Sequence, residues 1–209
     1  MKIITPSFSI VGKVNGKKIL KNIEAAGRTC YKIEDKITED SAKKFVANVI
    51  RSDHESVIEH EKVTVLIICD RGVTHEIVRH RLASYSQESS RYCNYSNEKF
   101  GGEITVIKPL FWKEDSLNYK IWKESCEAAE KAYFDLLTNG ATPQEARSVL
   151  PNSLKTEIVM TANLREWRHF FKLRCARASH PQMVEIARPI LKEFQNLIPI
   201  IFDDIQFDD

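Results

Sequence analysis

The sequence predicts an α+β fold in which a mainly antiparallel β-sheet is flanked by helices, within a single domain covering residues 1–209. Three observations support this prediction. Short β-branched runs are separated by helical segments without regular βαβ alternation. Apolar residues recur at helical spacing in several segments that carry capping residues at their ends. The sequence has neither a Gly-x-Gly-x-x-Gly loop nor a Walker loop, which excludes Rossmann and P-loop phosphate sites.

Five segments have the composition of strands. The clearest is Lys62–Asp70, where the sequence KVTVLIICD is rich in β-branched and apolar residues and Gly72 follows as a breaker. We expect the other strands at residues 2–4, 8–14, 104–107 and 156–162.

Three helices are expected in the first half of the chain. The first covers residues 18–30, the second begins after Thr38 as its N-cap, and the third is a short helix at 73–80. The third places Arg79 and the residues after it at a helix end. The apolar positions at helical spacing are Ile19, Ile23 and Ala26 in the first helix and Phe45, Val46, Val49 and Ile50 in the second.

Four helices are expected in the second half. A long helix at 115–137 ends before Asn139-Gly140, and a short one begins at Pro143 and carries Arg147. Asn163 can cap the third, with Glu166 at the capping-box position. The last covers 182–197, and Pro189 is predicted to kink it. The buried stripe of the long helix is expected to be Leu117, Ile121, Ala128, Ala132 and Leu136.

Composition and charge exclude several functional classes. The net charge is +2, which does not indicate a general nucleic-acid coat or a polybasic membrane binder. The N-terminus does not resemble a signal peptide and no apolar run reaches the ~20 residues of a membrane span. We therefore expect a cytoplasmic protein with reduced thiols and no membrane partner.

No metal site is expected. The five cysteines are odd in number and contain no Cys-x-x-Cys pair, which argues against a zinc ribbon or a disulfide framework. The segment HESVIEH, which spans His54–His60, lacks the His-Glu-x-x-His spacing that would place both imidazoles on one helix face.

The first segment that indicates a function runs from Arg79 to Tyr92. It contains four basic residues among serines, tyrosines and an amide, with Glu88 as its only acidic residue. Guanidinium groups bind phosphate through forked contacts, and hydroxyl and amide groups can donate to and accept from a base edge. A solvated, salt-bridged surface loop is the alternative. The basic residues are Arg79, His80, Arg81 and Arg91.

The second segment runs from Asn163 to His180. Arg165, His169 and Lys172 follow one another at helical spacing and form one stripe of a helix. Arg174 and Arg177 lie at its C-terminal end, where the helix dipole favours cations, so a solvated basic face remains an alternative. The buried side is expected to be Leu164, Trp167, Phe170, Phe171 and Leu173.

These motifs resemble the flavin-dependent thymidylate synthase family. Arg79-His80-Arg81, seven residues and then Ser89 resemble its signature, which continues as Ser-x-Arg-Tyr. PQEARSVLP at 143–151, NLREWRHFFKLRC at 163–175 and HESVIEH are similar to three further family segments in the same order. The resemblance extends from about residue 50 to 187 and leaves the first 50 residues unassigned.

The resemblance implies reductive methylation of dUMP to dTMP, with FAD as cofactor and NADPH and methylenetetrahydrofolate as co-substrates. It also implies a homotetramer whose active sites draw residues from several subunits. Arg174 corresponds to the arginine that activates the uracil ring, and His54 to a histidine near flavin and folate. The implied FAD contacts are Ser56, Arg79, His80, Arg81, Gln87, Asn163, Arg165 and His169. The implied dUMP contacts are Glu76, Arg79, Gln87, Ser89, Arg91, Arg147 and Arg174.

Two departures and one competing function complete the prediction. Some family members have Asn-Glu where this chain has Ser86-Gln87, which excludes a carboxylate role at that position. The stretch from Arg174 to His180 is longer than in some members, which leaves the role of His180 open. Ser89 has no identifiable base partner, so we expect it to bind nucleotide rather than act as a nucleophile. The alternative function is a single-stranded RNA-binding module that stacks bases on Tyr85, Tyr92 and Tyr95.

Overall fold

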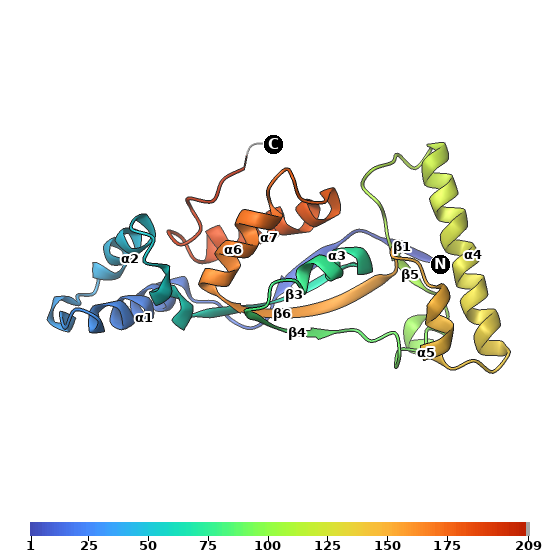
Figure 1. Cartoon of the computed structure of the whole chain (residues 1–209), viewed down its shortest axis with the longest axis horizontal. Coiled ribbons are helices and arrows are strands. Elements are labelled where there is room, and N and C mark those ends of the chain that lie inside the picture. The colour runs from blue at the N-terminus through green and yellow to red at the C-terminus, as the bar shows by residue number, and fades with distance from the viewer. Residues whose placement is uncertain (208–209) are drawn as a thin grey trace. The chain divides into compact units, whose positions relative to one another are not determined.

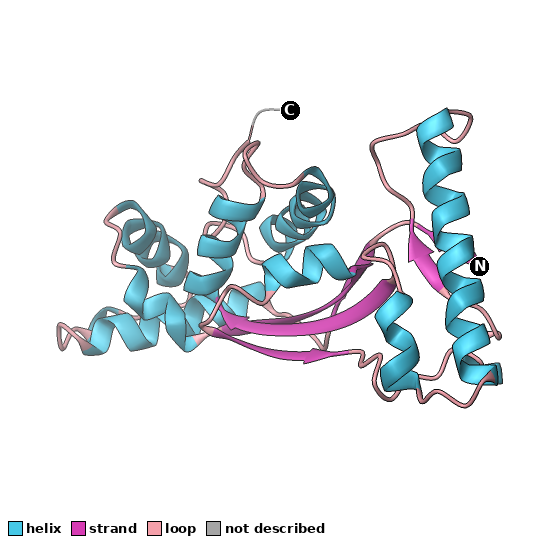
Figure 2. Ribbon diagram, turned by 45° about the vertical axis from the view of Figure 1, so that its right-hand side comes forward, coloured by secondary structure: helices cyan, strands magenta, loops and turns pink. Residues whose placement is uncertain are grey.

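The computed structural model describes residues 1–207, and Figure 1 labels the α-helices and most of the strands. These residues form helices beside an antiparallel sheet, which confirms the predicted α+β class. The sheet has the strand order β2-β3-β6-β4, and a second sheet pairs β1 with β5 in parallel. The strands, drawn in magenta in Figure 2, are β1 (Lys2–Ile4), β2 (Ser7–Ile10), β3 (Lys62–Asp70), β4 (Ala83–Gln87), β5 (Thr105–Ile107) and β6 (Lys155–Asn163).

Seven α-helices and four 3₁₀ helices occur in the described part of the chain. Among the described residues, no helix combines the length and apolarity that crossing a membrane requires. The α-helices are α1 (Gly16–Thr29), α2 (Ser41–Arg51), α3 (Arg71–Ile77), α4 (Leu117–Thr138), α5 (Pro143–Ala146), α6 (Leu164–Arg174) and α7 (Pro181–Leu197). The 3₁₀ helices are η1 (Glu34–Lys36), η2 (Glu55–His60), η3 (Glu98–Phe100) and η4 (Arg147–Val149).

The chain divides into two compact units, and strands β2, β3, β4 and β6 contribute residues to both. The prediction that residues 1–209 form a single domain stays a prediction. The first unit contains residues 1–7, 67–79 and 86–158, and the second contains residues 8–66, 80–85 and 159–209.

In the first unit, α4 packs against β5 through a periodic set of side chains. Tyr119, Cys126 and Tyr133 are the buried residues of α4 and recur every seven positions, two helical turns apart. Cys126 and Tyr133 join Ile104 and Val106 in one apolar cluster. The predicted stripe is wrong in its first half, where Leu117 is 71% and Ile121 55% exposed. Leu136, also predicted, does pack against this cluster.

In the second unit, α6 is anchored by aromatic packing against α7. The Trp167 ring lies 5.0 Å from that of Phe194, and the Trp167 indole nitrogen donates to the Val63 carbonyl of β3 at 3.0 Å. Leu164, Trp167, Phe170 and Phe171 are fully buried, as predicted, but Leu173 is 47% exposed. Leu173 lies two residues beyond Phe171, on another face of the helix. Helix α7 runs through Pro189, and the kink predicted there remains a prediction.

Two expected boundaries are wrong for local reasons. Helix α2 begins at Ser41 and not directly after Thr38. The reason is that the Ser41 hydroxyl accepts a hydrogen bond from the Thr38 backbone N–H at 2.9 Å and donates one to the Glu24 carboxylate. The strand expected at 8–14 ends at Ile10, since Gly12 adopts φ +83°, outside the extended region. All five cysteines carry free thiols, as expected.

The segment Arg79–Tyr92 contains a strand that was not predicted from the sequence. Strand β4 at Ala83–Gln87 alternates half-buried and exposed side chains along ASYSQ and lies at the end of the strand order, beside β6. Serine and glutamine have low strand propensity, so their composition did not indicate a strand. Pairing with β6 decides the conformation instead.

Candidate functional site

The site in the second unit begins at the junction between β6 and α6. Asn163 ends β6 and caps α6, since its side-chain oxygen accepts from the Glu166 backbone N–H at 2.8 Å. In a complete capping box the Glu166 carboxylate would return to the backbone N–H of Asn163. Instead, this carboxylate hydrogen-bonds His80 Nδ1 at 2.9 Å. The first turn of α6 therefore directs a carboxylate toward the central histidine of the Arg-His-Arg motif.

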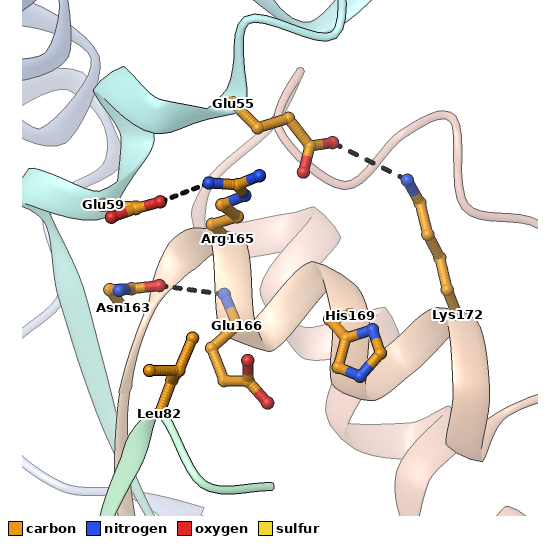
Figure 3. A pocket seen from close by; sticks show the side chains of 8 residues that line it. All are labelled: Glu55, Glu59, Leu82, Asn163, Arg165, Glu166, His169 and Lys172. Atoms are coloured by element: carbon orange, nitrogen blue, oxygen red, sulfur yellow. Dashed lines mark hydrogen bonds and ion pairs between the residues drawn. The ribbon is translucent and has the colours of Figure 1, made fainter.

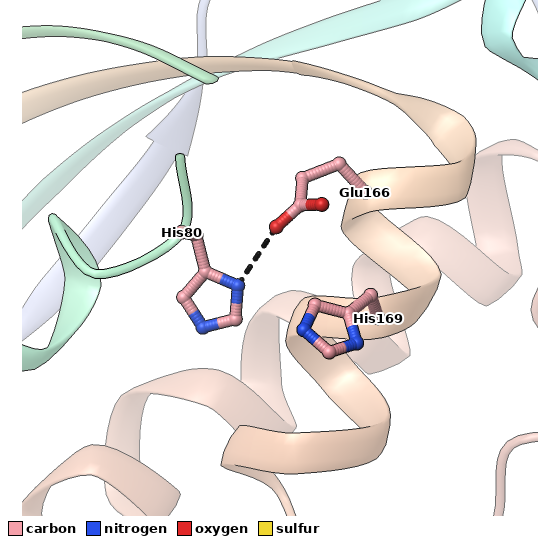
Figure 4. A group of neighbouring side chains, drawn as sticks. All are labelled: His80, Glu166 and His169. Carbon is pink, nitrogen blue, oxygen red and sulfur yellow. Dashed lines mark hydrogen bonds and ion pairs between the residues drawn. The ribbon is translucent and has the colours of Figure 1, made fainter. Parts of the chain in front are cut away.

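His80 lies at the centre of a polar cluster. The side chain of His80 is 3% exposed, and its Nε2 accepts from Arg174 Nε at 3.1 Å. Figure 4 shows its ring facing Glu166 and lying beside His169, with a distance of 5.4 Å between the two ring centroids. The Tyr85 hydroxyl donates to the His80 backbone carbonyl at 2.6 Å. Burial lowers the pKa of His80 below its ordinary value of 6.5, Arg174 and His169 also lower it, and the hydrogen bond that His80 makes to Glu166 opposes this shift.

A cavity of about 480 Å³ opens over the exposed face of α6. Figure 3 shows that the predicted basic stripe of Arg165, His169 and Lys172 lines it. Two carboxylates of η2 face this stripe: Glu59 pairs with Arg165 at 2.5 Å, and Glu55 approaches Lys172 at 3.6 Å. The complete lining is Glu55, Glu59, Leu82, Asn163, Arg165, Glu166, His169 and Lys172.

The first unit has a second polar cavity, of about 490 Å³. Arg147 was predicted to bind dUMP and lines this cavity together with Arg71, Ser90 and Ser148. Two guanidinium groups and two hydroxyl groups constitute a suitable donor set for a phosphate. Arg71 lies at the start of α3, outside the family motifs, so the sequence analysis missed it.

Gln87 is also in the first unit and is held by neighbouring threonines. Its amide nitrogen donates to Thr74 Oγ1 at 3.1 Å and to Thr156 Oγ1 at 3.3 Å. These two hydrogen bonds hold the Gln87 side chain, which was predicted to contact both FAD and the nucleotide, in one orientation at the end of β4.

The predicted site residues differ in exposure. His80 is buried, whereas the other candidates are accessible at least in part. Half-buried candidates are Glu76, Gln87, Ser89, Asn163 and Arg174; exposed candidates are His54, Ser56, Arg79, Arg81, Arg91, Arg147, Arg165 and His169. In the second unit, Asn163, Arg165 and His169 line the cavity over α6, and His80 and Arg174 contact each other. His54, Ser56 and Arg81 belong to the same unit but are not among the lining residues of that cavity.

Five residues that line the cavity were not among the predicted contacts: Glu55, Glu59, Leu82, Glu166 and Lys172, the last of which was predicted only as part of the basic stripe. The two η2 carboxylates are part of the HESVIEH segment, which was assessed for metal spacing but not for pairing with α6. Glu166 was assigned to the helix cap alone. Its distance of 86 residues from His80 in sequence left no local signal of their contact.

The comparison with known proteins identifies the family. The family described as Thymidylate synthase complementing protein matches residues 15–200. A flavin-dependent thymidylate synthase of Pyrococcus abyssi is 37% identical over 171 residues, which is 80% of this chain and 69% of the relative. The chain belongs to the flavin-dependent thymidylate synthase family. It is therefore a methyltransferase of dTMP biosynthesis and a flavoprotein, as predicted.

A second relative and a solved structure agree with this family. A flavin-dependent thymidylate synthase of Geobacter sulfurreducens is 31% identical over 189 residues, covering 87% of this chain and 80% of the relative. The fold is similar to that of the UMP/dUMP methylase PolB from Streptomyces cacaoi bound with 5-Br UMP, with a TM-score of 0.78 and 20% identity. That alignment covers 97% of this chain and 95% of the other, and at this identity it supports the fold alone.

Proposed function

We propose that the protein converts dUMP to dTMP by reductive methylation, with methylenetetrahydrofolate as one-carbon donor, NADPH as reductant and FAD as bound cofactor. Arg174 activates the uracil ring in this proposal. The observation that carries it is the hydrogen bond between Arg174 and the central histidine of the Arg-His-Arg motif, in the unit that also has the cavity over α6.

The donor set of the cavity over α6 suits FAD. Arg165 and Lys172 can neutralise a pyrophosphate, and His169 and Asn163 add a ring nitrogen and an amide as hydrogen-bonding groups. Arg165 and its partner Glu59 are both about half exposed, at 54% and 43% of their side-chain surfaces. An exposed pair of this kind contributes little to stability, so exchanging Glu59 for a phosphate oxygen is energetically accessible. When bound, FAD supplies the redox chemistry, and the protein supplies orientation and charge.

The cavity lined by Arg71 and Arg147 suits the 5′-phosphate of dUMP. Arg147 is exposed and Arg71 half-buried, so both guanidinium groups can reach a ligand. Ser90 and Ser148 supply hydroxyl groups to the same cavity. Arg71 is thus proposed as a further phosphate contact, in addition to the nucleotide residues implied by the family resemblance.

Arg174 acts on the charge that develops in the pyrimidine. A one-carbon unit can be added at C5 only when this carbon becomes electron-rich, which places negative charge on the O2/N3 edge. A guanidinium held beside that edge stabilises this charge without reorganising during the reaction. Its hydrogen bond to the buried His80 limits the orientations that the Arg174 side chain can adopt.

Self-association into a homotetramer is part of the proposal. Leu117 and Ile121 lie one turn apart on α4 and are 71% and 55% exposed. Apolar side chains adjacent on one helix face are suited to contact another subunit. Sedimentation velocity on the wild type and on Leu117→Glu tests this: a tetramer that the substitution weakens is expected, and a monomeric wild type contradicts it.

The competing RNA-binding function receives little support. Tyr95 is 6% exposed and its hydroxyl donates to Glu88, while Tyr85 is half-buried and bonded to His80. Only Tyr92, at 80% exposure, presents an open ring of the three expected stacking platforms.

The test of the proposed function is spectroscopic and chemical. The purified protein is expected to be yellow, to lose its flavin absorbance with NADPH in the absence of oxygen, and to form dTMP when dUMP and methylenetetrahydrofolate are added. Arg174→Ala is expected to retain FAD and its reduction but to lose dTMP formation. A colourless protein that FAD cannot reconstitute contradicts the proposal, and near-normal turnover of Arg174→Ala contradicts the role of Arg174.

A further inference from the structure

The buried contact between Glu166 and His80 fixes the proton positions on the His80 ring. Glu166 is 7% exposed, and its carboxylate oxygen lies 2.9 Å from Nδ1. An ionised carboxylate only accepts hydrogen bonds, so Nδ1 carries the proton. The other nitrogen, Nε2, is then an unprotonated acceptor, which is what the Nε–H of Arg174 requires at 3.1 Å.

The three side chains therefore form a directed chain of hydrogen bonds from Arg174 through His80 to Glu166. Each donor faces one acceptor, and a reversed histidine tautomer would place Nε2–H against the Nε–H of Arg174. The contact uses Nε of Arg174, the guanidinium nitrogen bonded to the side-chain stem. Binding at this nitrogen restricts rotation of the guanidinium plane.

We propose that Glu166 and His80 are positioning residues that fix the orientation of the Arg174 guanidinium for activation of the uracil ring. This inference rests on the proposed function of Arg174. It gives His80, which the family resemblance places at the flavin, a different role: both ring nitrogens are engaged within the protein, so His80 acts through Arg174.

A purely structural role for Glu166 accounts less well for its geometry. The helix cap is already made by Asn163, whose side chain accepts from the Glu166 backbone N–H. The Glu166 side chain is not needed for that bond and instead lies buried, where an ionised carboxylate is costly unless it is hydrogen-bonded. A cap function alone would leave this carboxylate in solvent near the helix N-terminus, which favours negative charge.

A metal site is the other function that these residues could serve. The ligand atoms of His80, Glu166 and His169 lie within 4.8 Å of one another. However, His80 Nε2 already accepts from Arg174, and a metal cation there would compete with the guanidinium. The cation at this position is thus Arg174 itself, which favours the hydrogen-bonded chain over a metal site.

The protonation state of His80 controls the chain. A second proton converts Nε2 into a donor and removes the acceptor for Arg174. The charged and titratable groups facing His80 are Glu166, His169 and Arg174 of α6 and, through its hydroxyl, Tyr85 of β4. Arg174 and His169 oppose a positive ring, and Glu166 favours it. The neutral ring is the competent form, so kcat falls as the pH falls through the pKa of His80.

The first test observes the tautomer directly and needs neither flavin nor substrate. In protein labelled with ¹⁵N-histidine, the proposal expects His80 to show a protonated Nδ1 and an unprotonated Nε2 at neutral pH. Glu166→Gln offers His80 an amide that can donate as well as accept, so the Nε2–H form is expected to appear. A wild-type His80 with Nε2–H overturns the proposal without any activity measurement.

The second test separates positioning from folding by kinetics. Glu166→Gln is expected to lower kcat about 10- to 100-fold, the loss that corresponds to one charge-assisted hydrogen bond, while flavin content stays the same. Glu24→Gln is the matched control: Glu24 is 1% exposed and bonded to Arg28 in α1, outside the site, so its kcat is expected to be unchanged. Retention of wild-type kcat by Glu166→Gln overturns the proposal.

A rescue variant covers the case in which Glu166→Gln does not fold. Glutamine at position 80 supplies one donor and one acceptor and does not titrate near neutral pH. His80→Gln is expected to keep much more kcat than His80→Leu and to lose the decline at low pH. Equal losses in both variants overturn the proposal. If Arg174→Ala instead keeps normal turnover, the proposed function of Arg174 has failed. The tautomer measurement needs no turnover, so it distinguishes that failure from failure of this inference.

Discussion

The buried guanidinium of Arg168 provides the sharpest test of how the site in the second unit is held together. Its side chain is 1% exposed, belongs to α6 and contacts Glu55, one of the residues that line the cavity. It pairs with Glu55 of η2 at 2.7 Å and with both carboxylate oxygens of Asp204 at 2.6 and 2.7 Å. A third partner is the Ile201 carbonyl. One side chain thus connects α6 to η2 and to the C-terminal segment.

Arg168→Met removes the charge but keeps an unbranched apolar stem in the same space. Breaking a buried pair costs about 3–5 kcal/mol, because the remaining partners stay buried without compensation. Asp204 is 46% exposed and can be rehydrated, and Glu55 keeps Lys172 at 3.6 Å. The expected loss is therefore at the lower end, about 3 kcal/mol. For a chain of this length it corresponds to a Tm decrease of about 6–12 °C.

Calorimetry and urea unfolding of the wild type and Arg168→Met measure this loss. The matched control is Lys131→Met, which removes an ion pair of 2.5 Å on α4 whose two side chains are 77% and 57% exposed. The control should lose no more than about 0.5 kcal/mol, because exposed helical pairs contribute little. Similar losses in both variants, or a loss under about 1 kcal/mol in Arg168→Met, would refute the argument from burial.

Stability against pH, the packing at Gly16 and the phosphate contact of Arg147 are three further properties that can be tested. The free energy of unfolding should fall as the pH falls from 6.5 toward the lowered pKa of His80, because in that range the unfolded chain binds a proton that the folded protein excludes. Urea unfolding at a series of pH values measures this decrease, and His80→Gln should remove the contribution of His80. Gly16→Ala should lose about 1–3 kcal/mol in urea unfolding, since the new Cβ would lie 2.2 Å from the Leu197 carbonyl oxygen; wild-type stability would contradict this. Arg147→Ala should weaken dUMP binding in a calorimetric titration by about 1.5–3 kcal/mol, and an unchanged Kd would exclude Arg147 as a phosphate contact.

The sequence predicted those parts of the fold that depend on local pattern. The β-branched run of β3 and the capped basic stripe of α6 were correctly predicted, because periodicity and capping are properties of neighbouring residues. Strand β4 was missed because its polar residues are extended only through pairing in a sheet. The stripe of α4 was predicted correctly at Leu136 but not at Leu117 and Ile121, because aliphatic residues were preferred to Tyr119 and Tyr133.

The candidate site was predictable as a set of residues but not as a set of contacts. The family motifs named His80 and Arg174, which are 94 residues apart in sequence, yet only the folded chain shows their hydrogen bond. Glu166 shows the limit most clearly. Its spacing from Asn163 predicted a capping box, and the structure directs its carboxylate to a histidine on another segment. Local spacing could not distinguish these two partners.

The central claim, that this chain methylates dUMP with Arg174 activating the ring, is tested most directly by single-turnover label transfer. The flavin-loaded protein is reduced with NADPH without oxygen and mixed with dUMP and methylenetetrahydrofolate labelled in its methylene carbon. We predict that labelled dTMP forms in an amount equal to the reduced flavin in the wild type. Arg174→Ala, reduced to the same extent, should form none. A reducible wild-type protein that forms no labelled dTMP, or an Arg174→Ala protein that forms as much as the wild type, would contradict the claim.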